Sequence, residues 1–112
     1  MKEKLTVLWT NADPITAELM VFMYTSNALR LEWWEEVEII VWGAPTKLVA
    51  EDEKIERSLK EVIESGVKVR FCTACAQGLG VYEQIEEKGF TLEYMGEALT
   101  DALKGEGKVL TV

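Results

Sequence analysis

Five short runs of apolar residues recur along the chain, separated by longer stretches with a helical period. Short runs rich in valine, isoleucine and aromatic residues are typical of β-strands. One run contains three consecutive β-branched residues, Ile39, Ile40 and Val41, which indicates a strand buried on both faces, as in a parallel sheet. The predicted strands are Leu5–Trp9, Val37–Trp42, Val67–Phe71, Phe90–Tyr94 and Lys108–Val112.

The stretches between these runs predict helices. Asp13 followed by Pro14 is a typical helix start, and the helix that follows is expected to reach about Leu31. Further helices are expected over Glu51–Glu64, from the Cys72–Cys75 segment to Lys88, and over Gly96–Lys104, whereas residues 48–50 are expected to form a short apolar turn.

The first predicted helix is apolar over more than one face. One side carries Ile15, Leu19, Phe22, Met23 and Leu29, and the apolar surface extends beyond it to Met20, Val21 and Tyr24. A helix of this kind needs a second surface to cover it. A sheet on one side and another subunit on the other would do so, which predicts self-association.

The alternation of strands with helices predicts an α/β protein: a three-layer α/β/α sandwich with a mostly parallel five-stranded sheet, flavodoxin-like in outline. Residues 1–112 contain no linker, repeat or low-complexity tract, so one domain is expected. The crossovers are expected to be right-handed, but the pattern does not determine the order of the strands.

Composition and charge narrow the possible functions. Twenty acidic residues against twelve basic ones give a net charge of −8, which argues against a nucleic-acid binder. The chain has no histidine, which excludes Ser-His-Asp and Cys-His hydrolases and histidine-ligated metal sites. No apolar stretch approaches the roughly 18 residues of a membrane span, and no signal peptide is recognised. We therefore expect a cytoplasmic protein whose two cysteines are reduced.

Those two cysteines, Cys72 and Cys75, follow the third predicted strand directly. Binding sites of open parallel sheets lie beyond the carboxyl ends of the strands, so both thiols are expected at the functional edge. A cysteine where a strand ends and a helix begins meets unpaired N–H groups and the positive end of the helix dipole. We therefore expect a lowered thiol pKa and assign the catalytic role to this pair. Residues at the same edge that we expect to contact a substrate or partner are Asn11, Gly43, Thr46, Lys47, Thr73 and Gln77.

Several other interpretations of the pair remain open. Both cysteines are small enough to be ordinary core residues. A CxxC motif also suits a redox pair, although a thioredoxin fold places a proline downstream of it, and Pro14 and Pro45 both come earlier. A structural zinc needs four ligands, so we expect no metal site in one chain.

Cofactor binding is not favoured by the remaining motifs. Gly78-Leu79-Gly80 starts like a dinucleotide fingerprint, but Glu83 stands where the third glycine should be. The tryptophans offer stacking surfaces for a flavin, which would make the protein yellow. Trp9 and Trp42 are instead expected in the core, and Trp33-Trp34 at a helix end or subunit surface. We therefore expect no cofactor.

The stretch from Phe71 to Val81 resembles the DsrE/DsrF-like family of sulfur-relay proteins. In that family a cysteine ends the third main strand and a Gly-aliphatic pair follows eight and nine residues later, as Cys72, Gly80 and Val81 do here. The resemblance extends over nearly the whole chain and includes Trp42-Gly43-Ala44-Pro45, Tyr94-Met95-Gly96 and Leu99-Thr100.

The resemblance implies a compact α/β/α domain over 1–112 that is often trimeric or hexameric. It also implies that Cys72 carries sulfur as a persulfide between a donor and an acceptor protein. Cys75 matches no residue that the relay proteins generally require. It would allow an alternative role as a CxxC thiol-disulfide redox or sensing protein. A second alternative is a non-catalytic, ligand-binding subunit of a hetero-oligomer.

Overall fold

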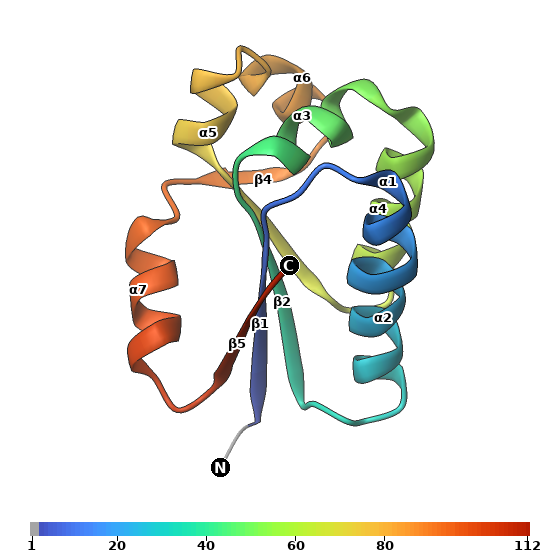
Figure 1. Cartoon of the computed structure of the whole chain (residues 1–112), viewed down its shortest axis with the longest axis vertical. Coiled ribbons are helices and arrows are strands. Elements are labelled where there is room, and N and C mark those ends of the chain that lie inside the picture. Colours follow the sequence, from blue (N-terminus) through green and yellow to red (C-terminus); the bar gives the residue numbers. More distant parts are fainter. Residues whose placement is uncertain (1–2) are drawn as a thin grey trace.

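The computed structural model, which describes residues 3–112, has a five-stranded sheet at its centre (Figure 1). The strands are β1 (Lys4–Trp9), β2 (Glu36–Val41), β3 (Lys68–Cys72), β4 (Thr91–Glu93) and β5 (Lys108–Thr111). Every neighbouring pair is parallel, and the order across the sheet is β4-β3-β2-β1-β5. The predicted parallel sheet is therefore confirmed, and the model supplies the strand order.

Helices cover both faces of this sheet, as predicted, but very unequally. The chain steps from β1 to β4 in one direction and then returns across the sheet to β5. Because parallel crossovers are right-handed, that return places its helix on the opposite face from all the others. Figure 1 accordingly shows α7 (Gly96–Lys104) apart from the remaining helices. These are α1 (Pro14–Thr16), η1 (Ala17–Phe22), α2 (Met23–Arg30), α3 (Ala44–Glu51), α4 (Glu53–Glu64), α5 (Thr73–Gly78) and α6 (Tyr82–Glu87).

The apolar core is divided between the two faces in the same unequal way. The large cluster includes the fully buried Trp9, Ile39, Leu59 and Phe71. The small cluster on the α7 face consists of Ile40, Cys72 and Met95, with partly buried residues around it. Burial of apolar surface on the first face therefore provides most of the hydrophobic stabilisation.

The long first helix begins as predicted and contains an unpredicted irregularity. The Asp13 carboxylate accepts a hydrogen bond from the Ile15 N–H and caps α1. The segment η1 is a π-helix, which widens the helix before α2 continues to Arg30. The Thr25 hydroxyl donates to the carbonyl of Val21, one of the carbonyls at this transition. The hydrophobic pattern alone does not distinguish a π turn from an α turn.

Two predicted segments were wrong. Residues 48–50, expected as a turn, belong to α3, which starts directly after Gly43 and has Pro45 in its first turn, where proline is well tolerated. The helix expected to run unbroken to Lys88 ends at Gly78. Gly80, with φ +71°, takes the left-handed conformation that closes a helix, and the Val81 N–H donates to the Ala76 carbonyl.

No helix within residues 3–112 has the length and apolar character needed to cross a membrane.

Candidate functional site

Cys72 lies at the carboxyl end of β3, where the sequence analysis placed it. It is the last residue of the strand and precedes α5 directly. Its side chain faces α7 rather than the main core and packs in the small cluster with Ile40 and Met95. Only 3% of Cys72 is exposed, so a large molecule cannot reach its sulfur in this conformation.

Cys75 lies one turn further along α5 and is the more accessible of the two thiols. Burial raises its pKa, and a hydrogen bond with Cys72 raises it further, while a backbone hydrogen bond from Gly43 acts in the opposite direction. The expectation of a lowered thiol pKa is therefore wrong for Cys75, because desolvation outweighs the N–H groups at the helix start. A raised pKa favours the protonated form of the Cys75 thiol.

Gly43 connects the loop after β2 to this pair. Its backbone has φ +79° and ψ −131°, a conformation that side-chain-bearing residues avoid. This conformation precedes α3 and brings the Gly43 N–H to the Cys75 sulfur. Gly43 and Cys72 are thus the two residues whose hydrogen bonds act on the pKa of the Cys75 thiol, in opposite directions. Of the edge residues predicted from the sequence, Gly43 makes direct contact with a cysteine.

The other predicted edge residues occupy separate positions. Thr46 and Thr73 are buried, and the Thr46 hydroxyl has no hydrogen-bond partner within residues 3–112. Lys47 is exposed and lines a shallow apolar pocket with Ala12, Ala44, Leu48, Glu51 and Leu79. Asn11 accepts a hydrogen bond from the Asp13 N–H, and Gln77 lies on an exposed surface with Gly80, Tyr82 and Glu83. Lys47 and Gln77 thus line two different pockets.

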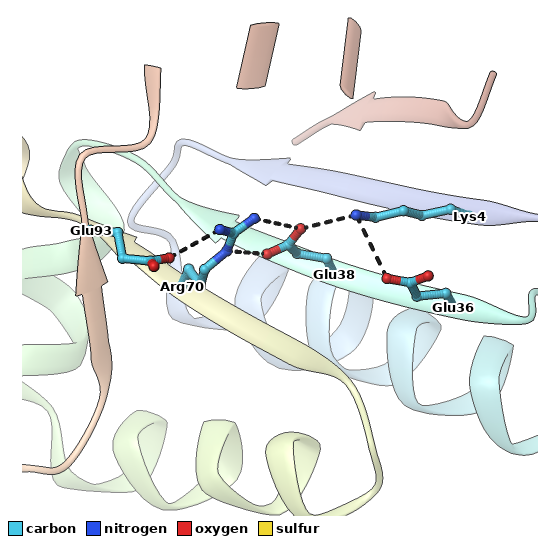
Figure 2. Close-up of polar contacts among 5 residues, drawn as sticks. All are labelled: Lys4, Glu36, Glu38, Arg70 and Glu93. Atoms are coloured by element: carbon cyan, nitrogen blue, oxygen red, sulfur yellow. Dashed lines mark hydrogen bonds and ion pairs between the residues drawn. The ribbon is translucent and has the colours of Figure 1, made fainter. Parts of the chain in front are cut away.

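The sequence analysis missed a group of charged residues on the sheet beneath α7. Figure 2 shows Lys4, Glu36, Glu38, Arg70 and Glu93, which come from four strands and pair with one another. Arg70 donates from Nε and Nη2 to the two carboxylate oxygens of Glu38, and from Nη1 to Glu93 at 3.0 Å. The alternation of charged and apolar residues in strands 36–41 and 67–71 was the signal that could have revealed this group.

The pairing determines the ionisation of Glu38. Burial by itself would raise the pKa of this carboxyl, but the hydrogen bonds from Arg70 and the positive charges of Arg70, Lys4 and Lys68 lower it overall. The Glu38 side chain is only 2% exposed, and an unpaired charge at such a position would be strongly unfavourable. The charge of Glu38 is stable there because both of its carboxylate oxygens are paired.

Helix α7 lies over both the cysteine cluster and the charged group. Met95, directly before the helix, is buried against Cys72, and Ala98 and Leu99 pack around it. Further along, Ala98, Asp101 and Ala102 line a cleft of about 390 Å³ whose floor includes Thr6, Glu38 and Arg70. No residue of α7 itself is buried.

The positions of the tryptophans and of the acidic and cysteine side chains bear on the sequence analysis. Within residues 3–112, no group of three or more histidine, cysteine or acidic residues is arranged to hold a metal ion. Trp9 is fully buried against Phe22, with ring centroids 5.3 Å apart, so it is a core residue as predicted. Trp42 borders the cysteine cluster. Trp33 is half-exposed, and Trp34 donates a hydrogen bond to the Tyr24 hydroxyl near the end of the first long helix.

Comparison with solved structures identifies the fold. The ychN protein from E. coli matches with a TM-score of 0.71 and 16% sequence identity, covering 98% of this chain and 99% of that one. The chain thus has a DsrE-like α/β fold.

A second solved structure is much more similar. It is the conserved protein of unknown function BT1422 from Bacteroides thetaiotaomicron, which matches with a TM-score of 0.92 and 38% identity, covering 98% of this chain and 95% of that one. The chain belongs to the same family as this protein. No protein-family model and no curated protein matches the chain.

Proposed function

We propose that this protein is a sulfur carrier of the DsrE type, which holds sulfur as a persulfide on Cys72 and passes it to a partner protein. The observation that carries the proposal is the arrangement of two thiols at the carboxyl end of β3, in contact with each other and with the Gly43 amide. The DsrE-like fold and the match of Cys72, Gly80 and Val81 to the family spacing support it.

The transfer consists of two exchange steps that need no histidine. The Cys72 thiolate attacks the outer sulfur of a donor persulfide, so an S–S bond forms at Cys72 and the donor leaves as a thiolate. An acceptor thiolate then attacks the outer sulfur of the Cys72 persulfide, and Cys72 leaves as a thiolate. Neither step changes the number of sulfane sulfur atoms, so no external oxidant or reductant is required.

Cys75 has a supporting role in this scheme. Because its pKa is raised, Cys75 is protonated at neutral pH and offers a hydrogen-bond donor to the sulfur of Cys72. The Gly43 N–H holds Cys75 in that position. A donor at this point stabilises negative charge on Cys72 as its sulfur leaves.

Contact between the thiols also favours a second candidate, a thiol-disulfide redox or sensing function. When Cys75 attacks the inner sulfur of a Cys72 persulfide, a Cys72–Cys75 disulfide forms and the outer sulfur departs as hydrosulfide. The two cysteines are then oxidised and the sulfane sulfur is reduced, so a cellular thiol must reduce the disulfide before the next cycle.

Intact mass spectrometry after incubation with a low-molecular-weight persulfide distinguishes the two functions. The carrier gains one sulfur atom, which a thiol reductant removes, and Cys72→Ser abolishes the gain while Cys75→Ser retains it. Loading that persists in Cys72→Ser and is lost in Cys75→Ser would overturn the assignment of Cys72. Loss of two hydrogens without added sulfur in the wild type would favour the redox function.

The proposed function requires partner proteins. A carrier needs a persulfide-bearing donor protein and a thiol-bearing acceptor protein in a reducing compartment such as the cytoplasm.

The family resemblance also implies self-association into a trimer or hexamer. Ile15, Leu19 and Met23 stand four residues apart, and each is at least half exposed, so they form an apolar stripe available for such contacts. Sedimentation of the wild type against Leu19→Lys, with Leu103→Lys on α7 as control, tests this part.

A further inference from the structure

The burial of Cys72 raises a question for any function that uses its sulfur. A carrier must present this atom to two partners, yet Cys72 is 3% exposed. It is enclosed on the α7 side by Met95, directly before the helix, and by Ala98 and Leu99 in the first turns of the helix. Ile40, by contrast, belongs to the central strand β2 and is fixed by the sheet. Leu8 in β1 and Trp42, whose N–H donates to the Trp9 carbonyl, are likewise fixed by the sheet, and Cys75 lies on α5. The part of the cover that can move is therefore the one at α7.

Helix α7 is attached to the sheet more weakly than the helices of the other face. It buries none of its own residues, whereas α4 buries Ile55, Leu59 and Val62. Beneath its middle lies the charged group, where Glu38 and Arg70 satisfy each other and line a cleft of about 390 Å³ rather than an apolar interface. Few buried apolar contacts are the feature that gives a segment a low free energy of local opening.

The two ends of α7 differ in how they are fixed. At the far end the chain is fixed by β5, whose pairing with β1 begins at Lys108. Gly107 packs so closely against β1 that an added Cβ would come within 2.7 Å of the Lys4 carbonyl oxygen. At the near end, Met95 and Leu99 provide the apolar contacts that hold the helix over Cys72. Separation at the near end exposes the sulfur without disturbing the main core, to which no residue of α7 belongs.

From this arrangement we infer that α7 is a gate over Cys72: its first turn, with Met95, must leave the cysteine cluster before a donor or acceptor reaches the sulfur. The inference rests on the proposed function for its biological meaning, but not for its physical test. A partner that binds the open form favours loading, and the closed form shields the persulfide from solvent and stray thiols.

Alkylation of Cys72 by iodoacetamide in the Cys75→Ser variant measures the opening directly. The rate is followed at urea concentrations below the unfolding transition. Local opening predicts a slow rate that rises with urea more weakly than the global unfolding equilibrium does, since little surface is exposed. A urea dependence equal to that of global unfolding would overturn the gate. So would a rate equal to that of a free thiol without urea, because Cys72 would then be accessible in the closed structure.

Two matched variants in the same helix locate the gate. Leu99→Ala removes a side chain that packs on the cysteine cluster and is expected to accelerate Cys72 alkylation about tenfold. Leu103→Ala removes a side chain that is 64% exposed and is expected to leave the rate unchanged. Equal rates in both variants would contradict the gate. Persulfide loading does not enter this measurement, so failure of the gate and failure of the carrier function are separate results.

Discussion

Arg70 on β3 holds the carboxylate of Glu38 on β2 through two of its guanidinium nitrogens (Figure 2). The pair lies on the face of the sheet beneath α7. The Arg70 side chain is 19% exposed and that of Glu38 is 2% exposed, so water provides little compensation for a lost partner. This ion pair explains how the face covered by α7 tolerates charge in the middle of a parallel sheet.

Arg70→Leu is expected to lower the free energy of unfolding by about 3 kcal/mol, because it leaves the Glu38 carboxylate buried with Lys4 as its remaining ion-pair partner. Urea denaturation followed by circular dichroism measures this change. The double variant Glu38→Leu/Arg70→Leu is the matched control and should recover most of the loss, since it removes both charges. A loss in the single variant below about 1 kcal/mol would mean that the pair behaves like an exposed salt bridge.

Acid is expected to destabilise the protein through Glu38. Its pKa in the folded protein lies below the ordinary value of 4.5, so the unfolded chain binds more protons as the pH falls below that value. The stabilisation from this group is therefore complete above pH 4.5 and is lost as the pH falls through the folded-state pKa. Glu56, whose pKa is lowered by hydrogen bonds from Lys88 and Lys60, acts in the same direction.

Urea denaturation at a series of acidic pH values checks this dependence. Glu38→Gln should show a weaker loss of stability with falling pH than the wild type, because the amide does not titrate. The same slope in both proteins would exclude Glu38 as a source of the acid sensitivity.

The Cys75 thiol is expected to ionise, and so to become reactive, only at high pH. Because burial and the Cys72 hydrogen bond raise its pKa above the ordinary 9.0, its alkylation rate should keep rising above that pH. Peptide mapping after brief iodoacetamide treatment at several pH values separates its rate from that of Cys72. In Cys72→Ala the hydrogen bond to Cys75 is lost, so the pH at which the Cys75 rate reaches half of its maximum should fall. It should stay above 9.0, since the burial of Cys75 remains. A midpoint below the ordinary value in the wild type would contradict this picture of the pair.

Gly43→Ala is expected to destabilise the protein by about 1–3 kcal/mol through backbone strain alone. Its φ of +79° is unfavourable for alanine, although an added Cβ would meet no atom within 4 Å. Gly78→Ala in α5 is the matched control: its φ is ordinary, it also has open space, and alanine favours helices. Equal stability of the two variants, measured by thermal unfolding, would show that the loop relaxes around residue 43.

Several features of the fold could be predicted from the sequence because they depend on neighbouring residues. The alternation of strands and helices, the cap at Asp13 and the position of Cys72 at a strand end all follow from local patterns. The end of α5 at Gly78 also depends on a local feature, the left-handed conformation of Gly80. It was not predicted, because the residues on both sides of Gly80 follow a helical pattern.

The candidate site was less predictable, because its properties arise between elements. Glu38 and Arg70 are 32 residues apart in the chain, and their pairing depends on the register of β2 with β3. The contact of Gly43 with Cys75 likewise joins the loop after β2 to helix α5, two segments that meet beyond the sheet.

The sequence by itself determined the class of fold and the edge of the sheet where the two cysteines lie, since hydrophobic period and turn residues act over short distances. Only the tertiary structure decided that β5 pairs with β1, and this return across the sheet places α7 alone on one face. That placement buries Cys72 under Met95, whereas Cys75 on α5 is the more exposed thiol. The accessibility of a reactive atom depends on which elements pack over it, and the packing of elements depends on contacts between residues far apart in the chain.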